Sequence, residues 1–289
     1  MSRADEGVVL DHVAVAVERW SDAWPRYVGE LGGTWHSGGV NVGFSPAQLR
    51  FANGARVEVL QPWEPEHNPF LRRFLDHSGP GPHHLTFKVR DIEAALRRAG
   101  DAGFEPVGVE LGDPHWQEAF LHPRQATGVV VQIAQADHEW RSPAPEGFPA
   151  SGGRPASLRQ VAHAVADLDT ALGLFGELLG GTVTGRAVDV GGWEWVDLSW
   201  GGPLDLRLLS PAGGGGSASA LGSWLGDRPG RVHHLTFAWP APASTGSTAP
   251  VPGGPPTAEE TVGVSSTAAV LRVVAASENL GTTLVLENP

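Results

Sequence analysis

The run LDHVAVAV at residues 10–17 alternates branched apolar residues around a central His12. Runs of the same kind recur as HHLTFKV at 83–89, VAHAVADL at 161–168 and HHLTFAW at 233–239. Their central histidines, His12, His84, His163 and His234, are separated by intervals of 72, 79 and 71 residues. Short apolar runs rich in β-branched residues are typical of buried strands. The regular recurrence predicts that one structural unit is written four times in this chain.

Each unit continues beyond its first strand in a similar way. An amphipathic stretch with helical spacing follows three of the four runs, and each stretch reaches a glycine, a usual residue at a helix C-terminus. These stretches are ERWSDAWPRYVGELGG at 18–33, RDIEAALRRAGDAGF at 90–104 and ADLDTALGLFGELLGG at 166–181. A strand-like run then closes each unit: ARVEVLQP at 55–62, GVVVQIAQ at 128–135, LDLRLLSP at 204–211 and TTLVLENP at 282–289. We therefore expect an α+β fold of four tandem βαβββ modules.

A change of composition divides the four modules into pairs. Residues 137–157 are rich in proline, glycine and serine, which predicts an exposed linker. The N-terminal domain would then comprise residues 1–136, with modules one and two, and the C-terminal domain residues 158–289, with modules three and four. In the fourth module the proline-rich segment 240–257 replaces the expected helix. The C-terminal domain is therefore predicted to be partly degenerate.

Composition excludes several classes of protein. A formal net charge of -12 and a pI near 5.4 oppose binding to nucleic acid, which needs clustered Lys and Arg. Without any cysteine, a metal would have to be held by His, Asp, Glu or Gln. The apolar run at the start is too short for a signal peptide or a membrane span. We expect a cytoplasmic monomer or homodimer that acts on a small molecule and has no membrane partner.

Four side chains of the N-terminal half recur at matched positions. His12 and His84 lie in the first strands of modules one and two, and Glu58 and Gln132 lie in the last strands. By pseudo-symmetry all four should face one concave surface, and Glu58 among apolar neighbours would be costly to bury without a partner. A catalytic ion needs three or four such ligands and one open position. The simpler interpretation is that the histidines are hydrogen-bonded core residues and Glu58 is solvated.

The runs LDHVAVAV, VEVLQP at 57–62, GPGPHHLTFKVRDIEAAL at 79–96 and FLHPRQATGVVVQIAQ at 120–135 together resemble the vicinal-oxygen-chelate superfamily. This superfamily includes glyoxalase I, methylmalonyl-CoA epimerase, extradiol dioxygenases and drug-resistance binding proteins. The resemblance implies two half-barrel domains and one divalent ion (Zn, Ni, Co, Mn or Fe) on the concave face, held by His12, Glu58, His84 and Gln132. Gln132 departs from the family, which normally has a carboxylate there. Glu58 would then be both a ligand and the catalytic base.

The resemblance implies three functions, which the sequence leaves open. The first is isomerase or lyase chemistry, in which the metal assists removal of a proton next to a carbonyl. The second is an Fe(II) extradiol-type dioxygenase that uses the C-terminal half, where the alternative ligands are His163, His234 and Glu287. The third is a non-catalytic small-molecule binding or resistance protein, which the 11 tryptophans favour. The residues expected to contact substrate are Asn41, His115 and Gln117.

Overall fold

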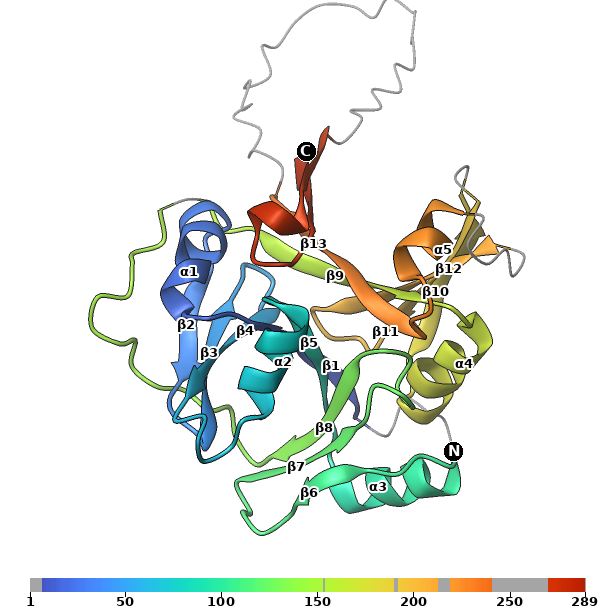
Figure 1. The fold of residues 1–289 in the computed structure, drawn as a ribbon, viewed down its shortest axis with the longest axis horizontal. Helices are drawn as coiled ribbons and strands as arrows, with labels where there is room; N and C mark the ends of the chain where they lie inside the picture. Colours follow the sequence, from blue (N-terminus) through green and yellow to red (C-terminus); the bar gives the residue numbers. More distant parts are fainter. Residues whose placement is uncertain (1–6, 153, 190–191, 213–218, 241–269, 289) are drawn as a thin grey trace, which may run out of the picture.

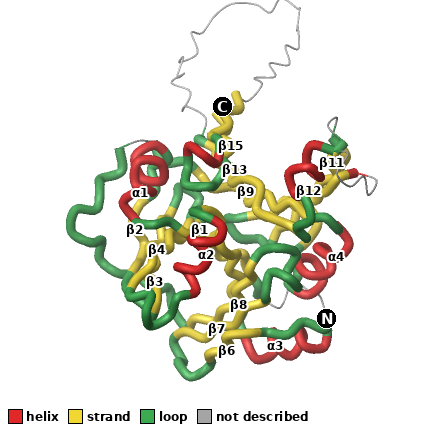
Figure 2. Tube along the Cα trace, viewed as in Figure 1, coloured by secondary structure: helices red, strands yellow, loops and turns green. Residues whose placement is uncertain are grey.

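The computed structural model describes residues 7–152, 154–189, 192–212, 219–240 and 270–288. The described strands form two sheets, one of eight strands from the first half of the chain and one of seven from the second (Figure 1). Few helices accompany them, as the colouring of Figure 2 shows. The predicted α+β fold is therefore confirmed.

The first sheet has the strand order β2-β3-β4-β1-β5-β8-β7-β6. Its strands are β1 (Val9–Ala16), β2 (Thr34–Gly38), β3 (Gly43–Arg50), β4 (Arg56–Trp63), β5 (Gly81–Lys88), β6 (Val107–Glu110), β7 (Trp116–Leu121) and β8 (Val130–Ala136). At its centre β1 and β5 are antiparallel, and each also pairs in parallel with the last strand of its own module, β4 or β8. Equivalent positions of the two modules therefore lie side by side at the middle of the sheet.

The second sheet repeats this arrangement in the order β10-β11-β12-β9-β13-β15-β14. Its strands are β9 (Ser157–Val165), β10 (Thr182–Val188), β11 (Trp193–Ser199), β12 (Asp205–Pro211), β13 (Gly230–Ala238), β14 (Val270–Val274) and β15 (Leu284–Asn288). Here β9 and β13 form the antiparallel centre, flanked by the parallel partners β12 and β15. Apart from Pro240, the segment 240–257 that was predicted to replace a helix lies outside the described residues.

Helices cover both faces of the sheets. The three predicted amphipathic stretches contain α1 (Trp20–Trp24), which continues as a π-helical turn (Pro25–Glu30), α3 (Ile92–Asp101), and α4 (Leu168–Leu172), which continues as another π-helical turn (Gly173–Leu178). Two further helices were not predicted, α2 (Phe70–Ser78) and α5 (Ala220–Leu225). They pack on the opposite face of each sheet, over small clusters centred on Ala14 and Ala162. Each half therefore has the same layers.

The two halves share one apolar core, in which aromatic rings of one half contact aromatic rings of the other. The ring of Phe87 on β5 lies 5.0 Å from the ring of Trp200, and Phe237 on β13 lies 5.0 Å from Phe51. The backbone also comes close where the halves meet. A Cβ at Gly128, whose φ is +87°, would lie 1.9 Å from the carbonyl oxygen of Gly230. Only glycine fits there without moving the backbone.

Apart from Ser157, which begins β9, the described residues of the predicted linker form no helix or strand, yet they pack against module one. The indole Nε1 of Trp35 donates a hydrogen bond to the carbonyl oxygen of Ser142 at 3.0 Å, and Phe148 stacks edge-on against Trp24 and Trp35. Figure 1 shows this green segment running along the outside of β2 and α1. No helix within the described part of the chain is long and apolar enough to cross a membrane.

Candidate metal centre

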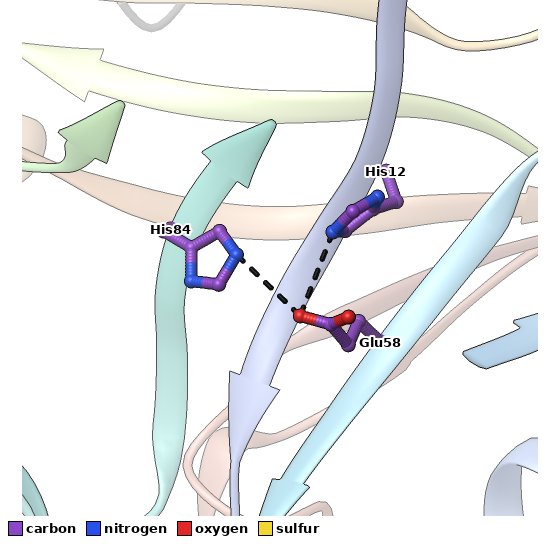
Figure 3. Close-up of side chains that lie close together, drawn as sticks. All are labelled: His12, Glu58 and His84. Atoms are coloured by element: carbon purple, nitrogen blue, oxygen red, sulfur yellow. Dashed lines mark ion pairs between the residues drawn. The ribbon is translucent and has the colours of Figure 1, made fainter. Parts of the chain in front are cut away.

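Three side chains from three adjacent strands converge on the face of the first sheet that points away from the shared core. Ala14 on β1 lies opposite both Glu58 on β4 and His84 on β5, and His12, two residues before Ala14, points to the same face. The Glu58 Oε2 atom lies 3.5 Å from the Nε2 atoms of both His12 and His84 (Figure 3). All three residues are buried, with one ligand atom of each within 4.8 Å of the others. The structure thus brings together three of the four predicted ligands.

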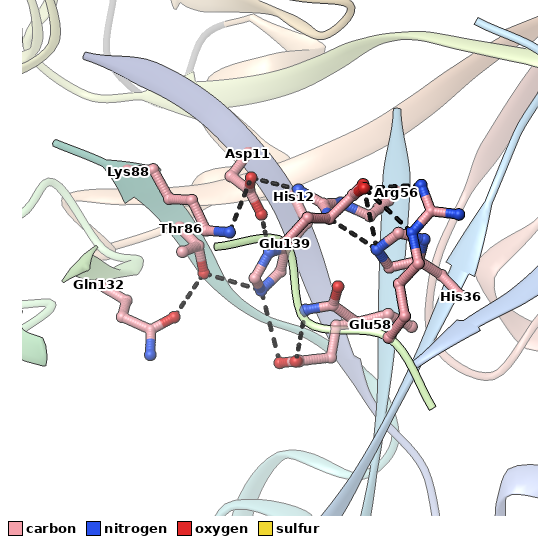
Figure 4. A network of polar contacts seen from close by, with 11 residues as sticks. Asp11, His12, His36, Arg56, Glu58, Thr86, Lys88, Gln132 and Glu139 are labelled. Carbon is pink, nitrogen blue, oxygen red and sulfur yellow. Dashed lines mark hydrogen bonds and ion pairs between the residues drawn. The ribbon is translucent and has the colours of Figure 1, made fainter. Parts of the chain in front are cut away.

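Asp11 fixes the orientation of His12. Its Oδ2 atom lies 2.8 Å from His12 Nδ1, so that Nδ1 can donate a hydrogen bond and Nε2 faces Glu58 (Figure 4). Arg56 forms an ion pair with Asp11, and the Nζ atom of Lys88 lies 3.6 Å from it. Burial alone would raise the pKa of Asp11, but the contacts with His12, Arg56 and Lys88 hold it well below its usual range. A carboxylate behind a histidine is the usual support for a metal-binding imidazole.

The electrostatics of the group favour a charged Glu58. Burial acts to raise the pKa of Glu58, yet the hydrogen bond with His12 and the electrostatic interactions with His12 and His84 lower it to about 2. Burial acts to lower the pKa of His12, whereas Glu58 and Asp11 raise it. A buried carboxylate between two imidazoles needs a cation, and His12 can supply one only by becoming protonated.

His84 gives the strongest indication that the group suits a metal ion. Its Nδ1 atom lies 2.9 Å from His83 Nδ1, but its buried Nε2 atom has no hydrogen-bond partner among the described residues. Burial and the neighbouring His83 hold the pKa of His84 well below its usual range, so the ring is neutral. If Nδ1 carries the proton, the lone pair of Nε2 points toward the Glu58 carboxylate. A divalent cation would satisfy both groups, so the donor set fits the metal.

Gln132, the fourth predicted ligand, is linked to His12 through the hydroxyl group of Thr86. Its Oε1 atom accepts a hydrogen bond from Thr86 Oγ1 at 2.6 Å, and Thr86 Oγ1 lies 2.9 Å from His12 Nε2 (Figure 4). The register explains this, because β5 and β8 place Thr86 opposite Gln132, while β1 and β5 place Thr86 opposite His12. Gln132 thus borders the three ligands, with the Thr86 hydroxyl group between its amide oxygen and His12.

The hydrogen bonds of Glu118 were not predicted from the sequence. The Nε2 atom of Gln132 donates a hydrogen bond to Glu118 Oε2 at 2.6 Å, and Trp116 Nε1 donates to the same oxygen at 2.7 Å. Glu118 lies on β7, the strand next to β8. Since a carboxylate can only accept, Glu118 fixes the Gln132 amide so that its oxygen faces Thr86 and His12. Alternation along WQEAF places Trp116 and Glu118 on one face, but the register of β7 was needed to see their partner.

The residues expected to contact substrate are not brought to this centre. Asn41 is exposed in the turn between β2 and β3, and Gln117 Nε2 donates to the carbonyl oxygen of Leu111 at 3.0 Å. His115 is exposed, with its Nδ1 atom 2.8 Å from Asp137 Oδ2. Together with Asp137 and His138 it forms a second, solvent-exposed group of possible ligands. No hydrogen bond or ion pair of these described residues links them to the buried centre.

The alternative C-terminal set, His163, His234 and Glu287, is not assembled by the second sheet. Ala162 lies opposite His234, so His163, one position along β9, points to the other face of the strand. The His163 Nε2 atom lies 2.9 Å from the carbonyl oxygen of Thr127, between the two halves. In the part of the chain that is described, these three residues are not among the groups with converging ligand atoms. His163 therefore contacts the backbone of the other half of the chain and not the two other residues of the alternative set.

The strand register shows why the two halves differ. Gln160 occupies the position of His12, because it lies opposite Thr236 as His12 lies opposite Thr86. Arg207 likewise occupies the position of Glu58, opposite Ala162. An alignment on histidines alone was three residues out of register on β9, and a shift by an odd number exchanges the faces of a strand. The second sheet therefore keeps only His234 of the buried centre.

Comparisons with known proteins agree with this architecture. The model of the Glyoxalase/Bleomycin resistance protein/Dioxygenase superfamily matches residues 11–120. Ethylmalonyl-CoA/methylmalonyl-CoA epimerase from Cereibacter sphaeroides is 30% identical over 135 residues, which cover 44% of this chain and 96% of the epimerase. The family-model match lies within the half that carries the buried centre.

Two solved structures resemble more of the chain, at identities that show the fold alone. A hypothetical protein from Staphylococcus aureus has a TM-score of 0.59 and 11% identity, and the match covers 98% of this chain and 100% of that one. A mutant of 4-hydroxymandelate synthase from Streptomyces coelicolor has a TM-score of 0.59 and 18% identity, and the match covers 81% of this chain and 71% of that one. The chain belongs to the glyoxalase/bleomycin resistance protein/dioxygenase superfamily.

Proposed function

We propose that the N-terminal half binds one divalent metal ion through His12, Glu58 and His84, with Gln132 as a fourth ligand, and that it catalyses an isomerase or lyase reaction. The observation that carries this proposal is the unpartnered, buried Nε2 atom of His84 beside the Glu58 carboxylate. Two imidazoles and one carboxylate suit Zn, Ni, Co, Mn or Fe. Binding would leave coordination positions for substrate oxygens.

The bound ion would act as a Lewis acid that stabilises negative charge on a substrate carbonyl oxygen. The proton is transferred to a side chain of the protein. In the proposed step the C–H bond next to the carbonyl breaks, its electron pair moves toward the carbonyl oxygen, and the Glu58 carboxylate accepts the proton. Gln48 Nε2, which donates to Glu58 Oε1 at 3.2 Å, holds that carboxylate in place. Returning the proton to the other face would complete an isomerisation.

The substrate class follows from the similar epimerase, which by its name acts on ethylmalonyl-CoA and methylmalonyl-CoA. We propose an acyl thioester with an acidic C–H bond and two neighbouring oxygens that reach the ion together. The chain has Gln132 where a second carboxylate would serve as a second base. The carboxylate of Glu118 stands directly behind it, at 2.6 Å. We do not propose an Fe(II) dioxygenase, because the C-terminal ligand set is not brought together.

The test is deuterium exchange at the acidic carbon. Methylmalonyl-CoA in D₂O is followed by proton NMR with protein that has been loaded with Co²⁺ or Zn²⁺, and with chelated protein as the control. We expect metal-dependent loss of the proton signal, and at least a hundredfold slower loss with Glu58→Gln. Exchange of equal rate in Glu58→Gln would contradict its role as the base. Exchange of equal rate in chelated protein would contradict the role of the metal.

A further inference from the structure

The second sheet carries a different set of side chains on the face that corresponds to the metal centre. Arg207 on β12 pairs with Asp197 on β11, in the positions that Glu58 and Gln48 hold in the first sheet. The Nε and Nη2 atoms of Arg207 donate to the two oxygens of Asp197, each at 2.7 Å. Gln160 Nε2 donates to the same carboxylate at 3.0 Å. A permanent cation thus stands where the first sheet has an anionic ligand.

Arg207 keeps part of its binding capacity. Asp197 occupies one edge of the guanidinium group, while Nη1 and the second hydrogen of Nη2 form another edge that can hold a carboxylate with two hydrogen bonds. The Arg207 side chain is 33% exposed, so this edge can be reached from solvent. The guanidinium also lies over the ring of Trp195, 4.4 Å from its centroid. Stacking on Trp195 and pairing with Asp197 fix its orientation before any ligand arrives.

Aromatic rings continue this face toward α5. His233 packs edge-on against both Trp193 and Trp224, with ring centroids 5.7 Å and 4.8 Å apart. Arg231 lies over the ring of Trp224 at 5.2 Å, which adds a second cation. Trp193, Trp195 and Trp224 all remain partly accessible. In the first sheet the corresponding cluster contains phenylalanines, which have no polar atom and offer less surface.

We propose that this surface, made by Arg207, Trp193, Trp195, Trp224 and Arg231, binds a small aromatic carboxylate without a metal ion. The free edge of Arg207 would hold the carboxylate, and the tryptophans would stack on the ring. Charge complementarity selects an anion. Asp197 pairs with Arg207 alone, and Arg231 forms no ion pair with any of the described residues. Tryptophan faces select a flat ring. The inference does not depend on the proposed enzyme activity.

His234 lies on the same face as Arg207 and does not supply the charge of this surface. Burial, His233 and Arg207 lower the pKa of His234 to about 3, so the ring is neutral at physiological pH and adds no charge of its own. Its Nδ1 atom lies 2.7 Å from His233 Nδ1. The positive charge of the surface therefore comes from the arginines, and substitution of Arg207 should remove the main contact with a carboxylate.

The test uses phenylacetate as the probe and phenylacetamide as its neutral counterpart, with full-length protein kept in chelator so that the N-terminal centre holds no metal. Isothermal titration calorimetry measures binding to the wild type, Arg207→Gln and Asp197→Asn. We expect one site with a dissociation constant at or below about 1 mM. Arg207→Gln should weaken binding at least about tenfold, and Asp197→Asn, which leaves Arg207 unneutralised, should tighten it several-fold.

Three controls make the result decisive. Arg272→Gln removes an exposed arginine of the same half that pairs with Glu30, and should leave binding unchanged. Circular dichroism checks folding, and the double variant Arg207→Gln/Asp197→Asn keeps a neutral amide pair if the single variant misfolds. Equal binding by the wild type and the Arg207 variants would overturn the proposal. So would no binding by the wild type, or equal affinity for phenylacetamide.

Discussion

Glu58 supplies the only negative charge of the proposed centre, so Glu58→Gln should be the most damaging conservative change. The free energy of binding Zn²⁺ to a four-ligand site is about 10–16 kcal/mol, or about 3 kcal/mol for an average ligand. The loss of one ligand therefore corresponds to about a hundredfold weaker binding. Removing the negative charge of Glu58 adds to this loss, because its Oε2 atom is buried, lies 3.5 Å from both imidazoles and would be close to the bound cation.

The assay is competition between the protein and a fluorescent zinc chelator of known affinity, at neutral pH. Asp197→Asn is the matched control, since Asp197 is a partly buried carboxylate on the equivalent face of the second sheet. We expect Glu58→Gln to bind Zn²⁺ at least about a hundredfold more weakly than the wild type, and Asp197→Asn to bind it equally well. Equal affinity in Glu58→Gln and the wild type would refute Glu58 as a ligand. Equal weakening in both variants would show that the effect is not specific to this centre.

Three further predictions concern residues around the centre and between the halves. Asp11→Asn should weaken metal binding about 10–100-fold in the same competition assay, because His12 loses the carboxylate that orients it; unchanged affinity would contradict that role. Glu118→Gln should weaken metal binding about tenfold, and the exchange Glu118→Gln/Gln132→Glu should restore it, since the hydrogen bond between the two side chains is kept with the charge moved toward the metal; an exchange variant as weak as the single one would argue against the pairing. For His163, burial lowers the pKa to about 4 from 6.5, so between these values the unfolded chain binds more protons and stability falls as the pH falls. The loss by pH 4 amounts to about 3 kcal/mol, and urea unfolding at pH 7 and pH 4 should show a smaller acid-induced decrease for His163→Gln than for the wild type.

The sequence was sufficient for the repeat and for the buried triad. Strands with a strong apolar pattern stood out, and pseudo-symmetry placed His12, Glu58 and His84 on one face before the register was known. The two missed helices are short, and α2 begins after Pro69 without a side-chain cap, so local signals were weak. Their place is determined by packing over Ala14 and Ala162.

The errors in the site have a different origin. His163 resembles His12 in its apolar surroundings, but it is three residues out of register, which reverses the face of the strand, and similarity of residues cannot show this. Asp11 is next to His12 in the sequence and Glu118 is on the strand beside that of Gln132, but both contacts depend on side-chain orientation and register, so neither was visible as a pattern. The pairing of Arg207 with Asp197 likewise required the register of β11 and β12.

The most direct test of the proposed centre is elemental analysis of protein purified without chelator or a nickel column. The wild type is compared with His84→Ala and with His234→Ala, its counterpart on the second sheet. We expect one divalent ion per chain in the wild type and in His234→Ala, and loss of that ion in His84→Ala. Metal lost from His234→Ala alone, or absent from all three proteins, would contradict a metal centre in the N-terminal half.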